Sequence, residues 1–316
     1  MLQKKIIIDT DIGDDIDDLI ALEYLVKRPD VKLIGITTVW MNSFLRARMV
    51  KKALSLLGKS DIPVYAGYGT PMESFHNIHL GEVFCQAESD LSRGEYSPNN
   101  EPGREEEAID FIVKNARKYG EELTILGIGP LTNIAKAFEK DEEAMKRVHL
   151  HIMGGCFFRP FVEWNIECDY LAAEKVFAKA IHMVAVGVDV TEKTVFDKDS
   201  QGAFHFDHTP YGQYRNRCIE LWQKANPTRT MTLHDPLAAM SIVEPSILEF
   251  ITRHVHVCAD RDGFTTGLTL PIEDLRGPLY VERMSNGYPL CRVASKVDVD
   301  AFRSQIRQMI EKGAKQ

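Results

Sequence analysis

Six aspartates fall within ten residues near the start of the chain: Asp9, Asp11, Asp14, Asp15, Asp17 and Asp18. Carboxylates this close repel one another unless a cation or buried protons compensate their charge. Helix capping accounts for one or two acids at the start of a helix, but not for six. Oxygen ligands are those that hard dications such as Ca²⁺ and Mg²⁺ prefer. The cluster therefore predicts a metal site, and the alternative is a solvated acidic turn with one N-cap.

Further candidates for chemistry lie far along the chain. Asp235 is the best candidate for a second acidic contribution to the metal site, although it could instead cap the helix that follows, with Pro236 at the first position. A metal-bound water beside a carboxylate is a good nucleophile, and His234 could protonate a leaving group. Glu163 and Asn165 offer a carboxylate and an amide that suit sugar hydroxyls. This set of groups predicts a hydrolase that acts on a polar, hydroxyl-rich substrate.

The elements that must position these residues alternate between strands and helices. Apolar runs predict strands at 5–8, 31–40, 62–67, 122–127, 148–153 and 182–190. Helical spacing predicts helices at 17–26, 43–58, 105–119, 131–139, 169–180, 211–225 and 299–312, and an apolar helix after Pro236. Buried strands separated by helices predict an α/β fold with a mixed, mainly parallel sheet and a Rossmann-like core.

Sites in such sheets form beyond the carboxyl ends of the strands. The turn 9–18, Asn42, Ile128 and the segment 154–165 all follow predicted strands, so we expect them to converge. Short β patterns from 254 to 299 predict a small antiparallel C-terminal subregion. No linker divides the chain, which predicts a single domain over 1–316. The irregular segment 68–103, which contains His76 and His79, is either a lid over the site or a surface excursion.

Composition narrows the class of protein. The net charge of -8 argues against a general nucleic-acid or anionic-membrane binder. No apolar run is long enough to span a bilayer, and no signal peptide precedes the first strand. The six cysteines are scattered without a C-x-x-C pair. That pattern is typical of reduced thiols and predicts a cytoplasmic protein without a disulfide framework or zinc site.

Several segments together resemble the nucleoside hydrolases of the inosine–uridine-preferring type. The segments are IIIDTDIGDDIDDLIAL (6–22), ITTVWMN (36–42), LGIGPLTNIA (126–135), MGG (153–155), EWN (163–165), HDPLA (234–238), TTGLT (265–269) and VDVDAF (297–302). They occur in the order found in that family and cover nearly the whole chain. The first motif and HDPLA are the most specific of them.

The resemblance implies an α/β fold, one Ca²⁺ per subunit and a homodimer or homotetramer. It implies hydrolysis of the N-glycosidic bond of ribonucleosides, purine or pyrimidine, to ribose and free base in nucleoside salvage. By position, Asp11 matches the base that activates a metal-bound water, and the metal ligands match Asp11, Asp18, the carbonyl of Ile128 and Asp235. Ribose contacts match Asp17, Asn42, Glu163 and Asn165, and His234 matches a histidine implicated in leaving-group activation.

The chain also departs from the family pattern. Ile12 replaces a proline in the first motif, and Asp14-Asp15 look inserted, so Asp14 or Asp15 could take the place of Asp17 or Asp18. Met41 stands where glycine usually precedes Asn42. Phe157, Phe158 and Arg159 replace a Gly-Asn that commonly contacts the 5′ end of the sugar. Phe157, Phe158 and Trp164 could stack on a base, or simply belong to the core.

Two other functions compete with this interpretation. A Mg²⁺-dependent phosphatase of the haloacid-dehalogenase type would use Asp9 as nucleophile and Asp11 as acid and base, but the distant Gly-Asp-x-x-x-Asp that such enzymes need is missing. A non-catalytic protein that binds a ribosyl ligand is the other possibility, and the altered segment 156–162 motivates it. Base preference does not follow from the sequence.

Overall fold

The first strand shows why helices must cover both faces of the sheet. In β1 (Lys4–Thr10), Ile6 and Ile8 belong to one buried apolar cluster and Ile7 belongs to another. Successive side chains of a strand point to opposite faces, so both faces of β1 are apolar. The computed structural model describes residues 3–93, 95–196, 204, 207–261, 263–275 and 288–313.

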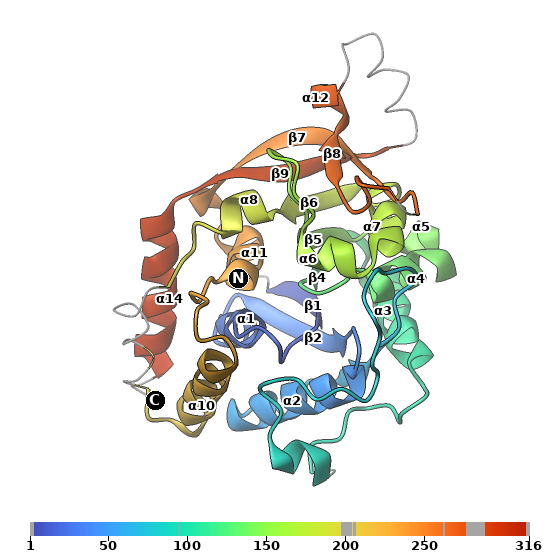
Figure 1. Cartoon of the computed structure of the whole chain (residues 1–316). Helices are drawn as coiled ribbons and strands as arrows, with labels where there is room; N and C mark the ends of the chain where they lie inside the picture. The colour runs from blue at the N-terminus through green and yellow to red at the C-terminus, as the bar shows by residue number, and fades with distance from the viewer. Residues whose placement is uncertain are drawn as a thin grey trace.

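The described strands form a single nine-stranded sheet in the order β3-β2-β1-β4-β5-β6-β9-β7-β8 (Figure 1). The strands after β1 are β2 (Val31–Thr38), β3 (Val64–Ala66), β4 (Leu123–Gly127), β5 (His149–Met153), β6 (His182–Val186), β7 (Leu248–Val257), β8 (Thr269–Pro271) and β9 (Leu290–Val297). All neighbours from β3 to β9 are parallel, whereas β7 runs antiparallel to both β9 and β8. The predicted α/β fold with a mixed, mainly parallel sheet is confirmed.

Two groups of helices pack on the two faces. The cluster that contains Ile6 and Ile8 includes residues of α1 (Asp17–Val26), α2 (Ser43–Leu56), α10 (Pro210–Ala225), α11 (His234–Val243) and α14 (Val299–Gly313). The cluster that contains Ile7 includes residues of α3 (Glu106–Tyr119), α4 (Thr132–Lys140), α5 (Glu142–Met145) and α7 (Tyr170–Phe177). In Figure 1, α10 and α14 lie on the left of the sheet and α3 and α4 on the right. The first group matters most for the site, because α1 and α11 begin there.

Short helices complete the order of elements. They are η1 (Ser89–Arg93), η2 (Gly120–Glu122), α6 (Trp164–Cys168), α8 (Val188–Thr191), η4 (Pro245–Ile247) and α12 (Ile272–Leu275). None of the helices in the described part of the chain is long and apolar enough to cross a membrane.

The structure differs from the predicted elements at two points. β6 ends at Val186 rather than at 190, because α8 begins just after Gly187. α6, which starts at Trp164, was not predicted, since five residues are too few to show helical spacing. The predicted antiparallel C-terminal subregion is confirmed, because β7 runs antiparallel to β8 and β9, and β9 joins it to the main sheet by pairing in parallel with β6. Residues 276–287 of that predicted region lie outside the described residues.

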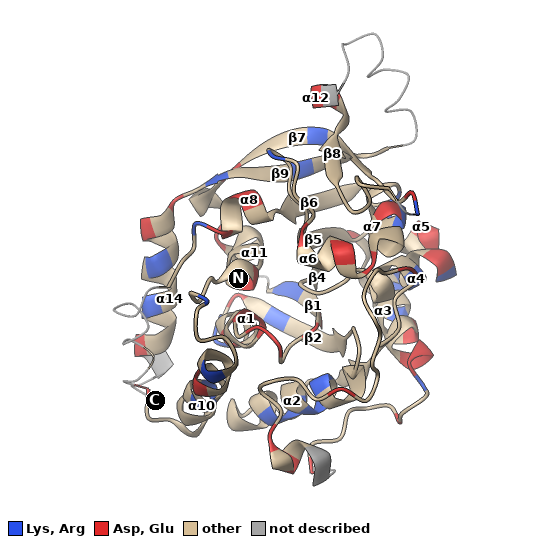
Figure 2. Ribbon diagram, viewed as in Figure 1, with Lys and Arg blue, Asp and Glu red and all other residues tan. Residues whose placement is uncertain are grey.

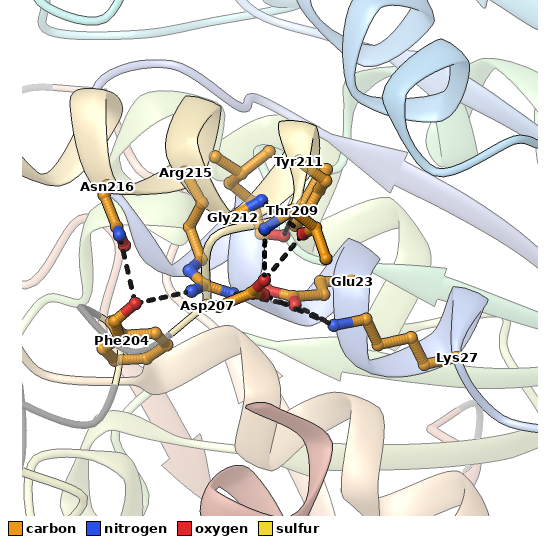
Figure 3. Close-up of polar contacts among 10 residues, drawn as sticks. Glu23, Lys27, Phe204, Asp207, Thr209, Tyr211, Gly212, Arg215 and Asn216 are labelled. Atoms are coloured by element: carbon orange, nitrogen blue, oxygen red, sulfur yellow. Dashed lines mark hydrogen bonds and ion pairs between the residues drawn. The ribbon is translucent and has the colours of Figure 1, made fainter. Parts of the chain in front are cut away.

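A buried ionic cluster fastens α10 to α1 (Figure 3). Nη1 of Arg215 donates to Oε1 and Oε2 of Glu23 at 2.8 and 3.0 Å, and lies 3.3 Å from Oδ2 of Asp207. These three side chains have no exposed surface. Lys27 donates to Glu23, and Nη2 of Arg215 donates to the carbonyl oxygen of Phe204. Because Glu23 lies near the end of α1, this cluster anchors the last turns of the helix against α10.

The histidine of β5 gives the fold a dependence on pH that can be measured. Nδ1 of His151 lies 2.7 Å from the Ser241 hydroxyl of α11, and burial lowers the pKa of His151 to about 3 from 6.5. The folded protein therefore keeps this ring neutral, while the unfolded chain takes up a proton below pH 6.5. The contribution of His151 to stability is complete above pH 6.5 and is lost as the pH falls from 6.5 towards 3.

We expect this loss to reach about 1.4 kcal/mol per pH unit. Urea unfolding between pH 7 and 4 measures it as the difference in slope between the wild type and His151→Asn, whose amide can still meet Ser241. Equal slopes in the two proteins would show that His151 is protonated in the folded state.

Candidate functional site

A cavity of about 640 Å³ opens at the carboxyl ends of the central strands. Its walls come from the turn after β1, from Ile128 after β4, from Met153 at the end of β5, from the start of α6 and from the start of α11. The predicted convergence is therefore confirmed for the turn after β1, Ile128 and the segment 154–165, whereas Asn42 does not line the cavity. Another cavity, of about 630 Å³, lies beside Glu121 and His182 at the other end of the strands and contains none of the predicted site residues.

Three buried carboxylates meet at one side of this cavity. Asp17, Asp18 and Asp235 each offer an oxygen, and these oxygens all lie within 4.8 Å of one another. The main-chain N–H of Asp235 donates to Oδ2 of Asp17 at 3.0 Å, and the Thr10 hydroxyl donates to Asp18. Figure 2 shows the acidic turn after β1 and the acidic first turn of α11 close together.

The electrostatics of this carboxylate cluster, Asp17, Asp18 and Asp235, fit a metal ion. Burial and the neighbouring carboxylates raise the pKa of all three groups well above the ordinary value for aspartate. A divalent cation bound among the oxygens would offset this repulsion, and an all-oxygen donor set is the one that hard cations take. The residues present therefore fit a hard dication.

The structure decides between the two interpretations of Asp235. α11 begins at His234, and its N-cap position is Leu233, whose side chain makes no capping hydrogen bond. Asp235 is the second residue of the helix, and its carboxylate lies beside those of Asp17 and Asp18 instead of capping its own helix. The capping alternative, with Pro236 at the first helical position, was wrong.

Asp11 lines the same cavity beside the carboxylate cluster, and its charge is among those that raise the pKa of Asp18. A Cβ atom on Gly129 would lie 2.8 Å from Oδ1 of Asp11, so only glycine leaves room for this carboxylate. Burial raises the pKa of Asp11 to about 7, although the positive charge of the nearby Arg46 guanidinium lowers it in part. A carboxylate with a pKa near neutrality suits a general base.

Glu163 and Asn165 also line the cavity, and both side chains are buried. Glu163 caps α6, because its carboxylate accepts hydrogen bonds from the N–H groups of Asn165, Ile166 and Gly155. Burial raises the pKa of Glu163 to about 7. Nδ2 of Asn165 donates to the carbonyl oxygens of Ile128 at 3.2 Å and of Met153 at 3.1 Å. The amide thereby joins the ends of β4 and β5 at the cavity.

His234 reaches the cavity as the first residue of α11. Its Nδ1 lies 2.7 Å from the Thr191 hydroxyl. Burial, helped by the positive charge of Arg229, lowers the pKa of His234 to about 4. The ring is therefore neutral near pH 7, with one nitrogen engaged by Thr191 and the other free for a ligand.

Two predicted residues are placed elsewhere. Asn42 does not line the cavity, and its side chain caps α2 by accepting from the N–H of Leu45. Asp9 is buried within the sheet, where it accepts hydrogen bonds from the Thr37 hydroxyl and from Nδ2 of Asn133. Because Asp9 does not reach the cavity, the phosphatase hypothesis loses its nucleophile.

The two extra acids of the first turn each have a basic partner. Asp14 pairs with Arg46 of α2. Oδ2 of Asp15 lies 3.0 Å from Nη2 of Arg229, which also lines the cavity. Neither acid takes the place of Asp17 or Asp18 in the carboxylate cluster. Sequence analysis did not single out Arg229, because an arginine in an irregular segment carries no periodic signal.

The aromatic residues that could stack on a base differ in their position relative to the cavity. Phe157 is buried in the core cluster that contains Ile7, and Phe158 is exposed outside the cavity. Trp164 lines the cavity with about half of its surface exposed, and so does Phe161, which was not predicted. Asp189 explains the position of Phe157 and Phe158, because its carboxylate accepts hydrogen bonds from both N–H groups.

The segment 68–103 forms hydrogen bonds at two points with residues close to the cavity. The carboxylate of Asp169 accepts hydrogen bonds from the N–H groups of Met72 and Glu73. Nε2 of Gln86 donates to the carbonyl oxygen of Asp15 at 2.7 Å. Between these points the ring of His76 lies 4.7 Å from that of Trp164, whereas His79 is not among the cavity-lining residues. The described part of this segment therefore borders the cavity.

Comparison with known proteins identifies the family. The sequence profile of inosine-uridine preferring nucleoside hydrolase matches residues 6–304. The chain is 29% identical over 311 residues to a probable uridine nucleosidase 2 of Arabidopsis thaliana, and the alignment covers 95% of each protein. It matches the structure of a purine-preferring ribonucleoside hydrolase from Gardnerella vaginalis with a TM-score of 0.80, at 27% identity over 99% of each chain. A plant nucleoside hydrolase matches with a TM-score of 0.78, at 27% identity over 97% of this chain and 98% of that one. With its carboxylate cluster at the carboxyl ends of a parallel sheet, the chain is an enzyme of the inosine-uridine preferring nucleoside hydrolase family.

Proposed function

We propose that the protein hydrolyses the N-glycosidic bond of ribonucleosides to ribose and free base, with Ca²⁺ held by Asp11, Asp18, the carbonyl of Ile128 and Asp235. The observation that carries this proposal is the meeting of three buried carboxylates and Asp11 in one cavity. When bound, the cation lowers the pKa of a coordinated water and orients vicinal hydroxyls of the sugar. We propose Ca²⁺ rather than Mg²⁺ because the oxygen donors include a main-chain carbonyl and come from several elements. Ca²⁺ accepts such an irregular set of oxygens, whereas Mg²⁺ requires a nearly octahedral one.

The proposed proton transfers use residues of this chain. Asp11 takes the proton of the attacking water, since its carboxylate faces the cavity and has a pKa of about 7. The bond from the anomeric carbon to the base breaks as the bond to the water oxygen forms, in one inverting displacement. The neutral ring of His234 donates a hydrogen bond from its other nitrogen to the leaving base, which takes its proton from water, while Thr191 holds Nδ1.

The walls of the cavity suit the charge that develops on the sugar. Glycosidic cleavage passes through a state with oxocarbenium character, which nearby carboxylates stabilise. Besides Asp14 and Asp15, whose charges are paired with Arg46 and Arg229, the acidic residues that line the cavity are Asp11, Asp17, Asp18, Glu163, Glu167 and Asp235. Asp17, Glu163 and Asn165 are proposed to bind the ribose hydroxyls. Asn42 would need a rearrangement of its capping bond to join them.

Release of ribose from inosine, adenosine, guanosine, uridine and cytidine tests this proposal. We expect release from at least one nucleoside, a drop of tenfold or more after treatment with a calcium chelator, and recovery on addition of Ca²⁺. Release that ignores the chelator would contradict the metal assignment. Binding of nucleosides, detected as thermal stabilisation, without any release would favour the binding-only alternative.

Calcium should also stabilise the fold. A ligand that binds only the folded state adds about 2.7 kcal/mol at a concentration of one hundred times its Kd. Melting curves of the chelated protein with added Ca²⁺ or Mg²⁺ measure this effect, and we expect the larger increase in Tm with Ca²⁺. An equal increase with both ions would assign the site to hard dications in general.

From the sequence we further propose a cytoplasmic, single-domain protein. From the resemblance to the family we propose that it forms a homodimer or homotetramer and serves nucleoside salvage.

A further inference from the structure

Arg46 of α2 is a buried cation directly behind the acidic turn, and only 1% of its surface is exposed. Its Nη1 donates to the carbonyl oxygen of Asp11 and, at 3.0 Å, to that of Ile12. Its Nη2 donates to the carboxylate of Asp14. Its guanidinium also lies 5.1 Å from the centre of the Phe84 ring. The side chain is therefore held in one position by contacts to the turn that follows β1.

The same guanidinium reaches the turn after β2. Nε of Arg46 donates to the carbonyl oxygen of Trp40 at 3.0 Å. Trp40 and Met41 have φ angles of 73° and 48°, in the left-handed region that residues other than glycine rarely adopt. Such residues cost of order 1–3 kcal/mol each and persist only where their surroundings hold them. Arg46 supplies part of that restraint, together with the backbone bond from Trp40 to Tyr68.

Arg46 thus ties together the turns at the ends of two neighbouring strands. One turn carries Asp11, and the other precedes Asn42 at the start of α2. The first turn also carries the acid Asp14, and in the second turn Trp40 and Met41 both have positive φ angles. Arg46 contacts the extra acid directly and holds the residue before Met41. A planar guanidinium can serve all these acceptors at once, whereas an ammonium group is a compact point charge.

We propose that Arg46 is a positioning residue of the reaction, which fixes the main chain of Asp11 so that its carboxylate points into the cavity against Gly129. The inference rests on the proposed role of Asp11 as general base. Displacement of a reacting group by about 1 Å can lower a rate by about a hundredfold. Arg46 therefore acts on the rate through Asp11, without touching the substrate.

The test compares Arg46→Lys and Arg46→Met with Arg215→Lys and Arg215→Met. Arg215 is a matched control, because it is equally buried and ionically paired but does not line the cavity. All variants are assayed at a temperature at which near-ultraviolet circular dichroism shows them folded. We expect kcat to fall about 30- to 100-fold in both Arg46 variants, with KM changed less than threefold. The Arg215 variants should lower Tm and leave kcat within twofold of the wild type.

Asp14→Asn separates the role of charge from the role of geometry. This variant removes the carboxylate charge but leaves the contacts of Arg46 with the carbonyl oxygens of Asp11, Ile12 and Trp40. We expect kcat within threefold of the wild type. Full kcat in both folded Arg46 variants would overturn the proposal, and so would a loss in Asp14→Asn as large as theirs. An equal loss of kcat in the Arg215 variants would overturn it as well, because the effect would then follow stability.

Hydrogen exchange keeps the inference testable even if the wild type hydrolyses no nucleoside, a result by which the proposed function alone would fail. We expect peptides that cover 9–18 to exchange about tenfold faster in Arg46→Lys than in the wild type, and at the wild-type rate in Arg215→Lys. Unchanged exchange of this segment in Arg46→Lys would show that Arg46 does not hold the turn.

Discussion

Replacement of Asp11 with asparagine is expected to lower kcat for ribose release by about a thousandfold. Asparagine has nearly the same shape, so the side chain can keep its place against Gly129 while losing the ability to accept a proton. The main chain remains fixed, because Arg46 bonds to the backbone oxygen of Asp11. The change therefore keeps the side chain in position but removes both the proton acceptor and its charge towards the metal, so the assays are run at saturating Ca²⁺. Initial rates of ribose release over a range of nucleoside concentrations give kcat and KM separately.

Asp14→Asn is the matched control for this experiment. Asp14 belongs to the same turn and lines the same cavity, but its side chain is half exposed and paired with Arg46. We expect a change in kcat of less than threefold. An active Asp11→Asn enzyme beside an inactive Asp14→Asn enzyme would reverse the assignment of the two acids and would make Asp14 the base.

The main features of this site could be predicted because they depend on local sequence. Apolar alternation in strands such as β1 predicts a sheet with two covered faces, and polar turns after parallel strands must meet at one edge. Asp11, Asp18, Ile128 and Asp235 accordingly line one cavity. The same reasoning could not decide between capping and clustering for Asp235, because both roles place an acid in the first turn of a helix.

Contacts between distant side chains were beyond sequence reasoning. Basic residues on an amphipathic helix such as α2 are typical of a solvated surface, yet Arg46 is buried against the first turn. Arg229 neutralises Asp15 from an irregular segment without a pattern of its own. Asn42 was predicted at the site from its place after a strand, but in the structure its amide oxygen caps the helix that it precedes. Each outcome depends on which long side chain reaches which partner, and periodicity does not encode that choice.

The ionic cluster between α1 and α10 is expected to carry the largest effect on stability. Arg215→Met leaves the carboxylates of Glu23 and Asp207 buried without their shared cation, and Lys27 can compensate only the former at short range. Removal of one partner from a buried ion pair costs about 3–5 kcal/mol, because the remaining charge stays desolvated. Urea unfolding at pH 7, followed by circular dichroism, gives the difference in the free energy of unfolding.

The surface pair of Arg159 and Glu192 provides the comparison that interprets this result. Both side chains of that pair are 45% exposed, so Glu192→Gln is expected to cost less than about 1 kcal/mol. A cost for Arg215→Met as small as that of Glu192→Gln would mean that Glu23 and Asp207 take up protons in the folded variant. Unfolding of Arg215→Met at pH 5 and pH 8 distinguishes protonated from charged carboxylates. If Glu23 and Asp207 take up protons, the variant loses less stability at pH 5 than at pH 8. If they stay charged, the loss of stability is the same at both pH values. A full cost at both would establish that charge pairing with α10 stabilises the end of α1 that carries Glu23.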